Sequence, residues 1–175
     1  MHLCYVDVEN ELLEIGREAG HLSAKLATLD LNEPPLDFQD EWEASLVCAS
    51  AAEKVYTGCE RVMAKIASDV DGVPVTHSEN WHRAVLLRMS HPFPEIRGPI
   101  ISAKCYSVMD KLRAFRHRER NTYGMDLDYR IVVERASEAV AGFKLFKHEV
   151  RAFFGQGNND EPDDEAAPDA SARRP

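Results

Sequence analysis

The chain has 175 residues, of which 44% are hydrophobic and 29% charged, and its formal net charge is −9. This size and composition are those of one globular domain with a core of its own. No run of about 18 apolar residues occurs, which argues against a membrane protein, and the acidic N-terminal stretch does not resemble a signal peptide, so we expect a cytoplasmic protein.

Hydrophobic residues recur at helical spacing along the body of the chain, and no segment shows the alternation typical of a strand. In chain order, the pattern predicts helices at about 6–29, 36–68, 81–90, 102–121 and 128–153. Stretches rich in Pro and Gly separate them. The expected fold class is all-α, an up-and-down bundle of four to five main helices with the short helix inserted between the second and the fourth.

Polar residues support the starts of two of these helices. Asp37, Asp40 and Glu41 suit the first turn of the second helix, because the helix dipole favours negative charge there. Ser78 or Asn80 is expected to cap the short helix.

The four cysteines are scattered singly, without a C-x-x-C pair, and are expected to be free thiols. Cys48 and Cys59 lie among Ala, Val and Leu, where a buried thiol is the natural interpretation. His77, His82 and His91 do not have the spacing of a zinc motif, so neither a metal nor another cofactor is expected.

The stretch FRHRERNTYGMD, residues 115–126, is strongly basic within an acidic chain. On a helix, spacings of three and four residues place Arg113, Arg116, Arg120 and Tyr123 along one face. Guanidinium groups suit planar, bidentate binding of phosphate, and a neighbouring histidine, here His117, can transfer protons near neutral pH. The segment therefore fits phosphodiester binding and possible cleavage.

The alternative for these arginines is a solvated face, or pairing with acidic residues of a neighbouring helix. Four acidic residues near the start of the second helix are candidates for such pairing: Asp37, Asp40, Glu41 and Glu43.

Residues 155–175 have no aromatic and no branched aliphatic side chain, so they cannot bury enough surface to order themselves. They carry six acidic residues against two arginines. We therefore expect a helical domain over residues 1–154 and a disordered acidic tail over 155–175. The tail either promotes solubility or competes with nucleic acid for the basic segment.

Four segments follow one another as in a known family. VYTGCERVMAKIA (55–67) resembles an aromatic-Tyr-x-Gly-x-Glu segment, and ENWHRAVLLRMS (79–90) a Trp-His-x-x-Leu-Leu-x-x-Met element. EIRGPIIS (95–102) is similar to an Arg-Pro-x-Ile-Ser stretch with one glycine inserted, and KLRAFRHRERNTYGMDLD (111–128) to a Phe-Arg-His-x-x-Arg-x-x-Tyr segment. Together, over roughly residues 40–153, they resemble the HepT-like branch of the HEPN (higher eukaryotes and prokaryotes nucleotide-binding) superfamily.

The resemblance implies an all-helical homodimer. Many such proteins are ribonuclease toxins that act on RNA and are encoded beside a minimal nucleotidyltransferase (MNT) antitoxin. The family's motif is Arg, four residues, His, one residue and Tyr. Arg116 and Tyr123 match its first and last positions, whereas Asn121 stands where the family has its catalytic His.

By the same resemblance, Arg116 would bind the scissile phosphate, with Arg113 and Arg120 as further phosphate-binding residues, and the antitoxin would adenylylate Tyr123. A histidine would transfer protons, so that no metal is required. Asn121 cannot do so at neutral pH. Either His117 takes over this duty, or the chain binds RNA or nucleotide without efficient cleavage.

Three residues outside the motif have two interpretations each. Glu60 on the long helix can orient Arg116 or His117, or it can form an ordinary salt bridge. Trp81 is expected to anchor the short helix rather than stack on a base, and His82 to be a structural hydrogen-bonding residue rather than a catalytic one.

Three functions remain open at this point. The leading hypothesis is a HepT-like, metal-independent endoribonuclease toxin of a toxin–antitoxin pair. The second is a non-catalytic HEPN-type helical dimer that binds nucleotide or RNA and has lost nuclease activity through Asn121. The third is a structural partner protein whose arginines are solvated or paired with acidic residues of a neighbouring helix.

Overall fold

The structure is a computed structural model that describes residues 2–30, 32–75, 80–121 and 128–155. It contains five helices: α1 (His2–Leu26), α2 (Phe38–Asp69), α3 (Trp81–Ser90), α4 (Ala103–Asn121) and α5 (Tyr129–Phe153). Within these ranges there is no strand, only an isolated bridge between Phe93 and Arg97. The prediction of an all-α bundle is confirmed. The prediction of a disordered tail concerns residues that, after Gly155, lie outside the described ranges.

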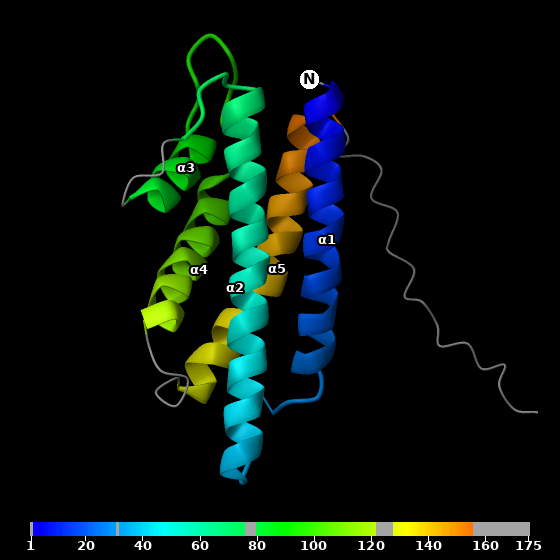
Figure 1. Cartoon of the computed structure of the whole chain (residues 1–175), viewed down its shortest axis with the longest axis vertical. Coiled ribbons are helices and arrows are strands. Elements are labelled where there is room, and N and C mark those ends of the chain that lie inside the picture. Colours follow the sequence, from blue (N-terminus) through cyan, green and yellow to red (C-terminus); the bar gives the residue numbers. More distant parts are fainter. Residues whose placement is uncertain (1, 31, 76–79, 122–127, 156–175) are drawn as a thin grey trace, which may run out of the picture.

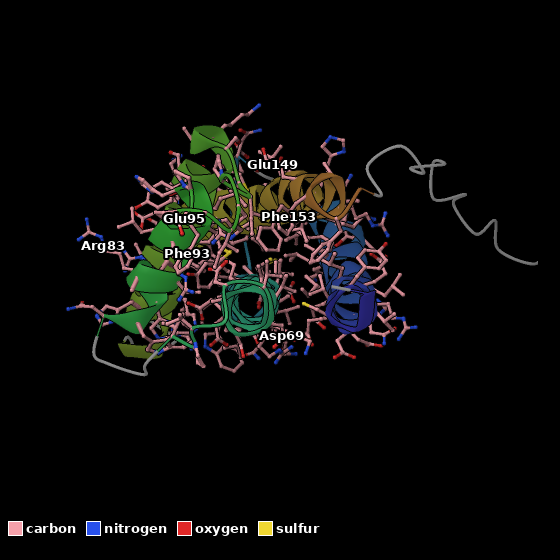
Figure 2. All side chains as sticks on the ribbon, turned by 90° about the horizontal axis from the view of Figure 1, so that it is seen from above. Asp69, Arg83, Phe93, Glu95, Glu149 and Phe153 are labelled. Carbon is pink, nitrogen blue, oxygen red and sulfur yellow. The ribbon has the colours of Figure 1, made fainter. Side chains whose placement is uncertain are left out.

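The helices form an up-and-down bundle with α2 at its centre (Figure 1). α2 packs against each of the other four helices, with α1 and α5 on one side and α3 and α4 on the other. Seen from above, α2 is viewed end-on in the middle of the molecule (Figure 2). No described helix is long and apolar enough to cross a bilayer.

The predicted ends of α1 were wrong by a few residues. The helix begins at His2 rather than near Val6, and it ends at Leu26 rather than Leu29. After Leu26 the chain tightens into a turn, in which the Leu29 amide donates to the Leu26 carbonyl at 3.2 Å. Leu29 still packs against the core, so the apolar pattern continues past the end of the helix.

The caps of α2 and α3 differ. Asp40 and Glu41 lie in the first turn of α2, as predicted, whereas Asp37 is its N-cap, and the Asp37 carboxylate accepts hydrogen bonds from the amides of Gln39 and Asp40. Asn80, one of the two residues expected there, occupies the N-cap of α3, although its side chain makes no capping hydrogen bond. Ser78, the other candidate, lies outside the described residues.

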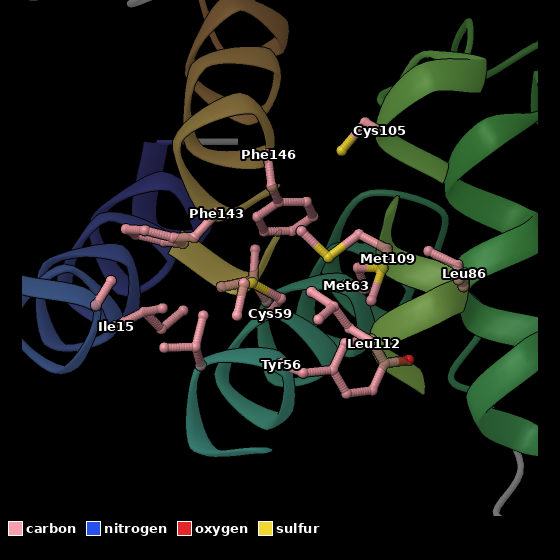
Figure 3. Close-up of a cluster of buried hydrophobic side chains, with 14 of the residues drawn as sticks. Ile15, Tyr56, Cys59, Met63, Leu86, Cys105, Met109, Leu112, Phe143 and Phe146 are labelled. Carbon is pink, nitrogen blue, oxygen red and sulfur yellow. The ribbon is translucent and has the colours of Figure 1, made fainter. Parts of the chain in front are cut away.

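One continuous core joins all five helices (Figure 3). Its buried side chains include one or more from each helix: Ile15, Tyr56, Cys59, Met63, Leu86, Met109, Leu112, Phe143 and Phe146. The cysteines are free and buried, as expected for Cys48 and Cys59 and found also for Cys4 and Cys105.

A glycine lets α1 lie very close to α2. A Cβ atom at Gly58 would lie 2.4 Å from Cγ1 of Ile15, closer than any real side-chain contact. Gly58 directly follows Thr57 in α2. The close contact with α1 therefore fixes the position of this stretch of α2, which meets α3 and α4 on its other face.

The position of α3 is fixed by a buried carboxylate just after α2. Asp71 accepts from Nε and Nη2 of Arg97 at 2.6 and 2.9 Å, and from Nε of Arg88 at 2.7 Å. The Arg88 guanidinium also lies 4.7 Å from the centre of the Phe93 ring, within the range of a cation–π contact. This cluster ties α3 and the segment leading to α4 onto the end of α2.

Candidate functional site

Arg116 on α4 is enclosed rather than solvated. Its side chain is 13% exposed. Its Nε donates to Oγ1 of Thr57 at 3.2 Å and lies 3.4 Å from Oε1 of Glu53, both on α2. Its Nη1 lies 3.4 Å from Nε2 of His82 on α3. Three helices thus meet around this guanidinium.

His82 is held by a buried carboxylate. Its Nδ1 lies 2.6 Å from Oε1 of Glu60, whose side chain is 2% exposed. Because a carboxylate only accepts hydrogen bonds, Nδ1 of His82 must carry the hydrogen of this bond. In the neutral ring Nε2 is then the acceptor, and Arg116, which only donates, faces it.

Aromatic side chains surround this pair. The Trp81 ring lies 4.1 Å, centre to centre, from the His82 ring and packs against the main core, as expected for an anchor of α3. Burial, and then the neighbouring Glu60 carboxylate, raise the pKa of Tyr56, so its hydroxyl stays neutral beside Glu60. Figure 3 shows the Tyr56 ring among the core residues.

Glu60 was expected to orient Arg116 or His117, or to form an ordinary salt bridge. In the structure its partner is His82, and it reaches Arg116 through the imidazole ring. His82 is a hydrogen-bonding residue, as the sequence indicated, but it belongs to the surroundings of Arg116, which the sequence did not indicate. The one available signal was the Trp-His pair at the start of α3.

The remaining arginines of the basic segment are only partly described. Arg113 is half-buried, and its Nε donates to Oδ1 of Asp110 on the same helix at 2.7 Å. His117 is exposed. The side chains of Arg120 and Asn121, and all of Tyr123, lie outside the described residues, so the expected face of three arginines and a tyrosine is described only at Arg113 and Arg116.

The acidic partner of Arg116 is not one of the four expected from the start of α2. Asp37 caps that helix, and Glu43 accepts from the side chain of Gln39. The carboxylate that faces Arg116 is Glu53, several turns further along α2. This expectation was wrong because the sequence pattern does not determine which turn of α2 lies opposite Arg116. That pairing depends on how α4 packs against α2.

Among the described residues, no three His, Cys, Asp or Glu side chains gather as possible metal ligands. The described contacts instead bring together the Arg116 guanidinium, the His82 imidazole and the carboxylates of Glu53 and Glu60. This arrangement can bind an anion on Arg116 and can accept a proton on His82.

The chain matches the model of a known family. A family model described as HepT-like protein matches residues 47–156, which is more than half of the chain and includes every residue around Arg116. No curated protein and no solved structure gives a significant match. The matched region holds most of α2 and all of α3, α4 and α5, with Arg116 and the Glu60–His82 pair at their junction. On this evidence the chain belongs to the HepT-like protein family.

Proposed function

We propose that this protein is an endoribonuclease toxin of the HEPN type that cleaves RNA without a metal ion. The observation that carries the proposal is the enclosed guanidinium of Arg116, which faces a carboxylate-bound histidine. Membership of the HepT-like family supports the same conclusion.

Arg116 is suited to bind the scissile phosphate. Its contacts with Thr57, Glu53 and His82 are 3.2 to 3.4 Å long, whereas charge-assisted hydrogen bonds to phosphate are about 2.7–2.9 Å. A phosphodiester therefore offers Arg116 stronger hydrogen bonds than these three described contacts do. The guanidinium would also stabilise the charge that develops on phosphorus oxygens during cleavage. Arg113 and Arg120 would add further phosphate contacts along α4.

The proposal includes the setting in which such a toxin works. Residues 1–154 would act as one helical domain in the cytoplasm, followed by the acidic segment 155–175. Two copies would form a homodimer and so double the positive field around the RNA. An MNT-type antitoxin would adenylylate Tyr123, adding bulk and negative charge beside the phosphate site.

The second candidate function is favoured by Asn121. An amide can donate and accept hydrogen bonds but cannot transfer a proton at neutral pH. In this case the protein is a HEPN-type dimer that binds RNA or nucleotide through Arg116 and does not cleave it. If cleavage occurs, another residue must transfer the proton, and His117, next to Arg116 in the sequence, is one candidate.

The test is RNA cleavage in the presence of EDTA by the wild-type protein and by Arg116→Ala. We expect wild-type cleavage and a loss of about 10²–10³-fold in the variant, the usual cost of removing one group that stabilises developing charge. Arg83→Ala is the matched control, because Arg83 is exposed on α3 and points away from the bundle (Figure 2).

Two further variants separate the candidate functions. A wild-type protein that binds RNA but does not cleave it, together with cleavage by Asn121→His, would establish the non-catalytic alternative. Cleavage that is lost in His117→Ala would assign proton transfer to His117. An unchanged rate in Arg116→Ala would exclude the proposed phosphate site.

A further inference from the structure

We propose that His82, held by Glu60, is the residue that accepts the proton from the RNA 2′-hydroxyl. The proposal rests on the ribonuclease function proposed above and names the base for it. It concerns a residue on α3, outside the basic segment that the sequence singled out.

The first argument is position. Nε2 of His82 lies 3.4 Å from Nη1 of Arg116, so an anion bound to Arg116 is placed directly beside the imidazole ring. His117, the next residue along α4, is exposed. Neighbouring residues of an α-helix point about 100° apart, so His117 cannot share the direction of Arg116 on α4.

The second argument is the tautomer. The bond between Nδ1 and Glu60, at 2.6 Å, keeps the hydrogen on Nδ1 and leaves the lone pair on Nε2. The side chain of His82 is 28% exposed, while that of Glu60 is buried. A ligand can therefore approach the ring, whereas the carboxylate behind it is shielded from water.

The third argument is charge. Accepting a proton turns His82 into a cation beside Arg116, which is unfavourable if nothing compensates it. Two groups do so: the Glu60 carboxylate stabilises the imidazolium from behind, and the bound phosphodiester places a negative charge on Arg116. In the free protein the Arg116 guanidinium faces the lone pair of Nε2. Binding of phosphate draws Arg116 toward the anion and frees Nε2 for the 2′-hydroxyl.

The chemical step balances with RNA and water alone. The O–H bond of the 2′-hydroxyl breaks and its proton passes to Nε2 of His82. The 2′ oxygen forms a bond to phosphorus, and the bond from phosphorus to the 5′ oxygen of the next nucleotide breaks. The departing 5′ oxygen takes a proton from water, and His82 returns its own proton to water. The products are a 2′,3′-cyclic phosphate and a 5′-hydroxyl end.

The decisive variant is His82→Asn in the full-length chain. The amide nitrogen of an asparagine can still donate to Glu60, so the buried carboxylate keeps a partner, but it cannot accept a proton. With a short RNA under single-turnover conditions in EDTA, we expect the cleavage rate to fall about 10²–10⁴-fold, the usual contribution of a general base. RNA affinity, measured separately, should change by less than about 3-fold, because Arg116 is intact. This change in affinity is small beside the expected loss in rate, so the two effects can be told apart.

A second measurement distinguishes proton transfer from a structural role. His82→Ala should regain part of its activity when imidazole is added, because free imidazole can occupy the vacated space and accept the proton. The matched control is His91→Asn at the end of α3, where Nδ1 lies 3.0 Å from the Leu87 carbonyl, and its rate should equal that of the wild type. If His82→Asn does not fold, as judged by circular dichroism, His82→Gln takes its place.

The outcomes separate the two proposals. Wild-type cleavage at an unchanged rate in His82→Asn overturns the role of His82 and leaves the ribonuclease function standing. A rate that falls together with RNA affinity, and that imidazole does not restore, shows that His82 only positions Arg116 and also overturns the proposal. A wild-type protein that cleaves no RNA overturns both.

Discussion

Arg97 and Arg116 are both shielded from solvent, but their contacts suit them to different roles. Arg97 is 2% exposed and bound to Asp71 through two hydrogen bonds of 2.6 and 2.9 Å. Its Nη1 also donates to the carbonyls of His91 and Gly98. Among the described residues, the contacts of Arg116 are longer and come from two other helices. A guanidinium held by short hydrogen bonds to a buried carboxylate supports the fold, whereas one with longer contacts can exchange its partners for a ligand.

Asp71→Asn tests the structural role of this cluster. The substitution removes the negative charge that two shielded arginines share, and it leaves Arg97 as a buried, uncompensated cation. We expect the free energy of unfolding to fall by about 3–5 kcal/mol, as when one partner of a buried ion pair is removed. Urea unfolding followed by circular dichroism measures it.

Asp69→Asn is the matched control, because Asp69 pairs with Lys65 where both side chains are about one-third exposed. Its effect should stay within about 1 kcal/mol, as for other solvent-exposed pairs. Equal effects of the two substitutions would show that burial of the Asp71 pair adds nothing to stability.

At the scale of the helices, the sequence predicted much of what the structure contains. The apolar period of α2, α3, α4 and α5 predicted their bounds to within a few residues, because each buries one continuous face.

The candidate site was predicted only in part. Arg116 and Glu60 stood out by residue type and family resemblance, but the link between them through His82 joins residues 22 and 34 positions apart. Such contacts depend on how three helices cross, which periodicity alone does not determine.

The close approach of α1 and α2 gives a test at this scale. In Gly58→Ala the new Cβ would lie 2.4 Å from Cγ1 and 2.9 Å from Cδ1 of Ile15. The two helices must then separate or Ile15 must leave its rotamer, so we expect destabilisation of about 1–3 kcal/mol. Thermal and urea unfolding of the variant measure it.

Gly20→Ala provides the control on α1. It is also a helical glycine, but a Cβ there would meet nothing within 4 Å. Since alanine favours the helix by about 1 kcal/mol over glycine, this variant should be more stable than the wild type. A stabilising effect of Gly58→Ala would show that the two helices have room to spare.

For the molecule as a whole, α2 contributes both to the core and to the candidate site. One side of this helix contributes Cys59 and Met63 to the common core, and another contributes Glu53, Thr57 and Glu60 to the surroundings of Arg116. The candidate site therefore lies on the helix that packs against all the others, an arrangement that would hold His82 and Arg116 in fixed relation, as the proposals require.

Because this core contains buried thiols, the stability of the whole molecule should fall at alkaline pH. Burial raises the pKa of Cys4, Cys48, Cys59 and Cys105 above their ordinary value of 9.0. As the pH rises through 9, the unfolded chain therefore loses these protons at a lower pH than the folded chain does. Because the unfolded state then binds fewer protons, stability falls as the pH rises.

Each such thiol contributes a slope of up to about 1.4 kcal/mol per pH unit, so the free energy of unfolding should drop steeply between pH 9 and pH 10. Urea unfolding at pH 7, 9 and 10 with a reductant present measures the slope. Cys105→Ala should reduce the slope, since a buried thiol whose pKa is raised is then gone. Val85→Ala, which also truncates a fully buried side chain, should lower stability at every pH and leave the slope unchanged.

Equal stability of the wild type at pH 7 and pH 10 would contradict this prediction. It would mean that these thiols ionise as readily in the folded protein as in the unfolded chain, and that the core around α2 admits water.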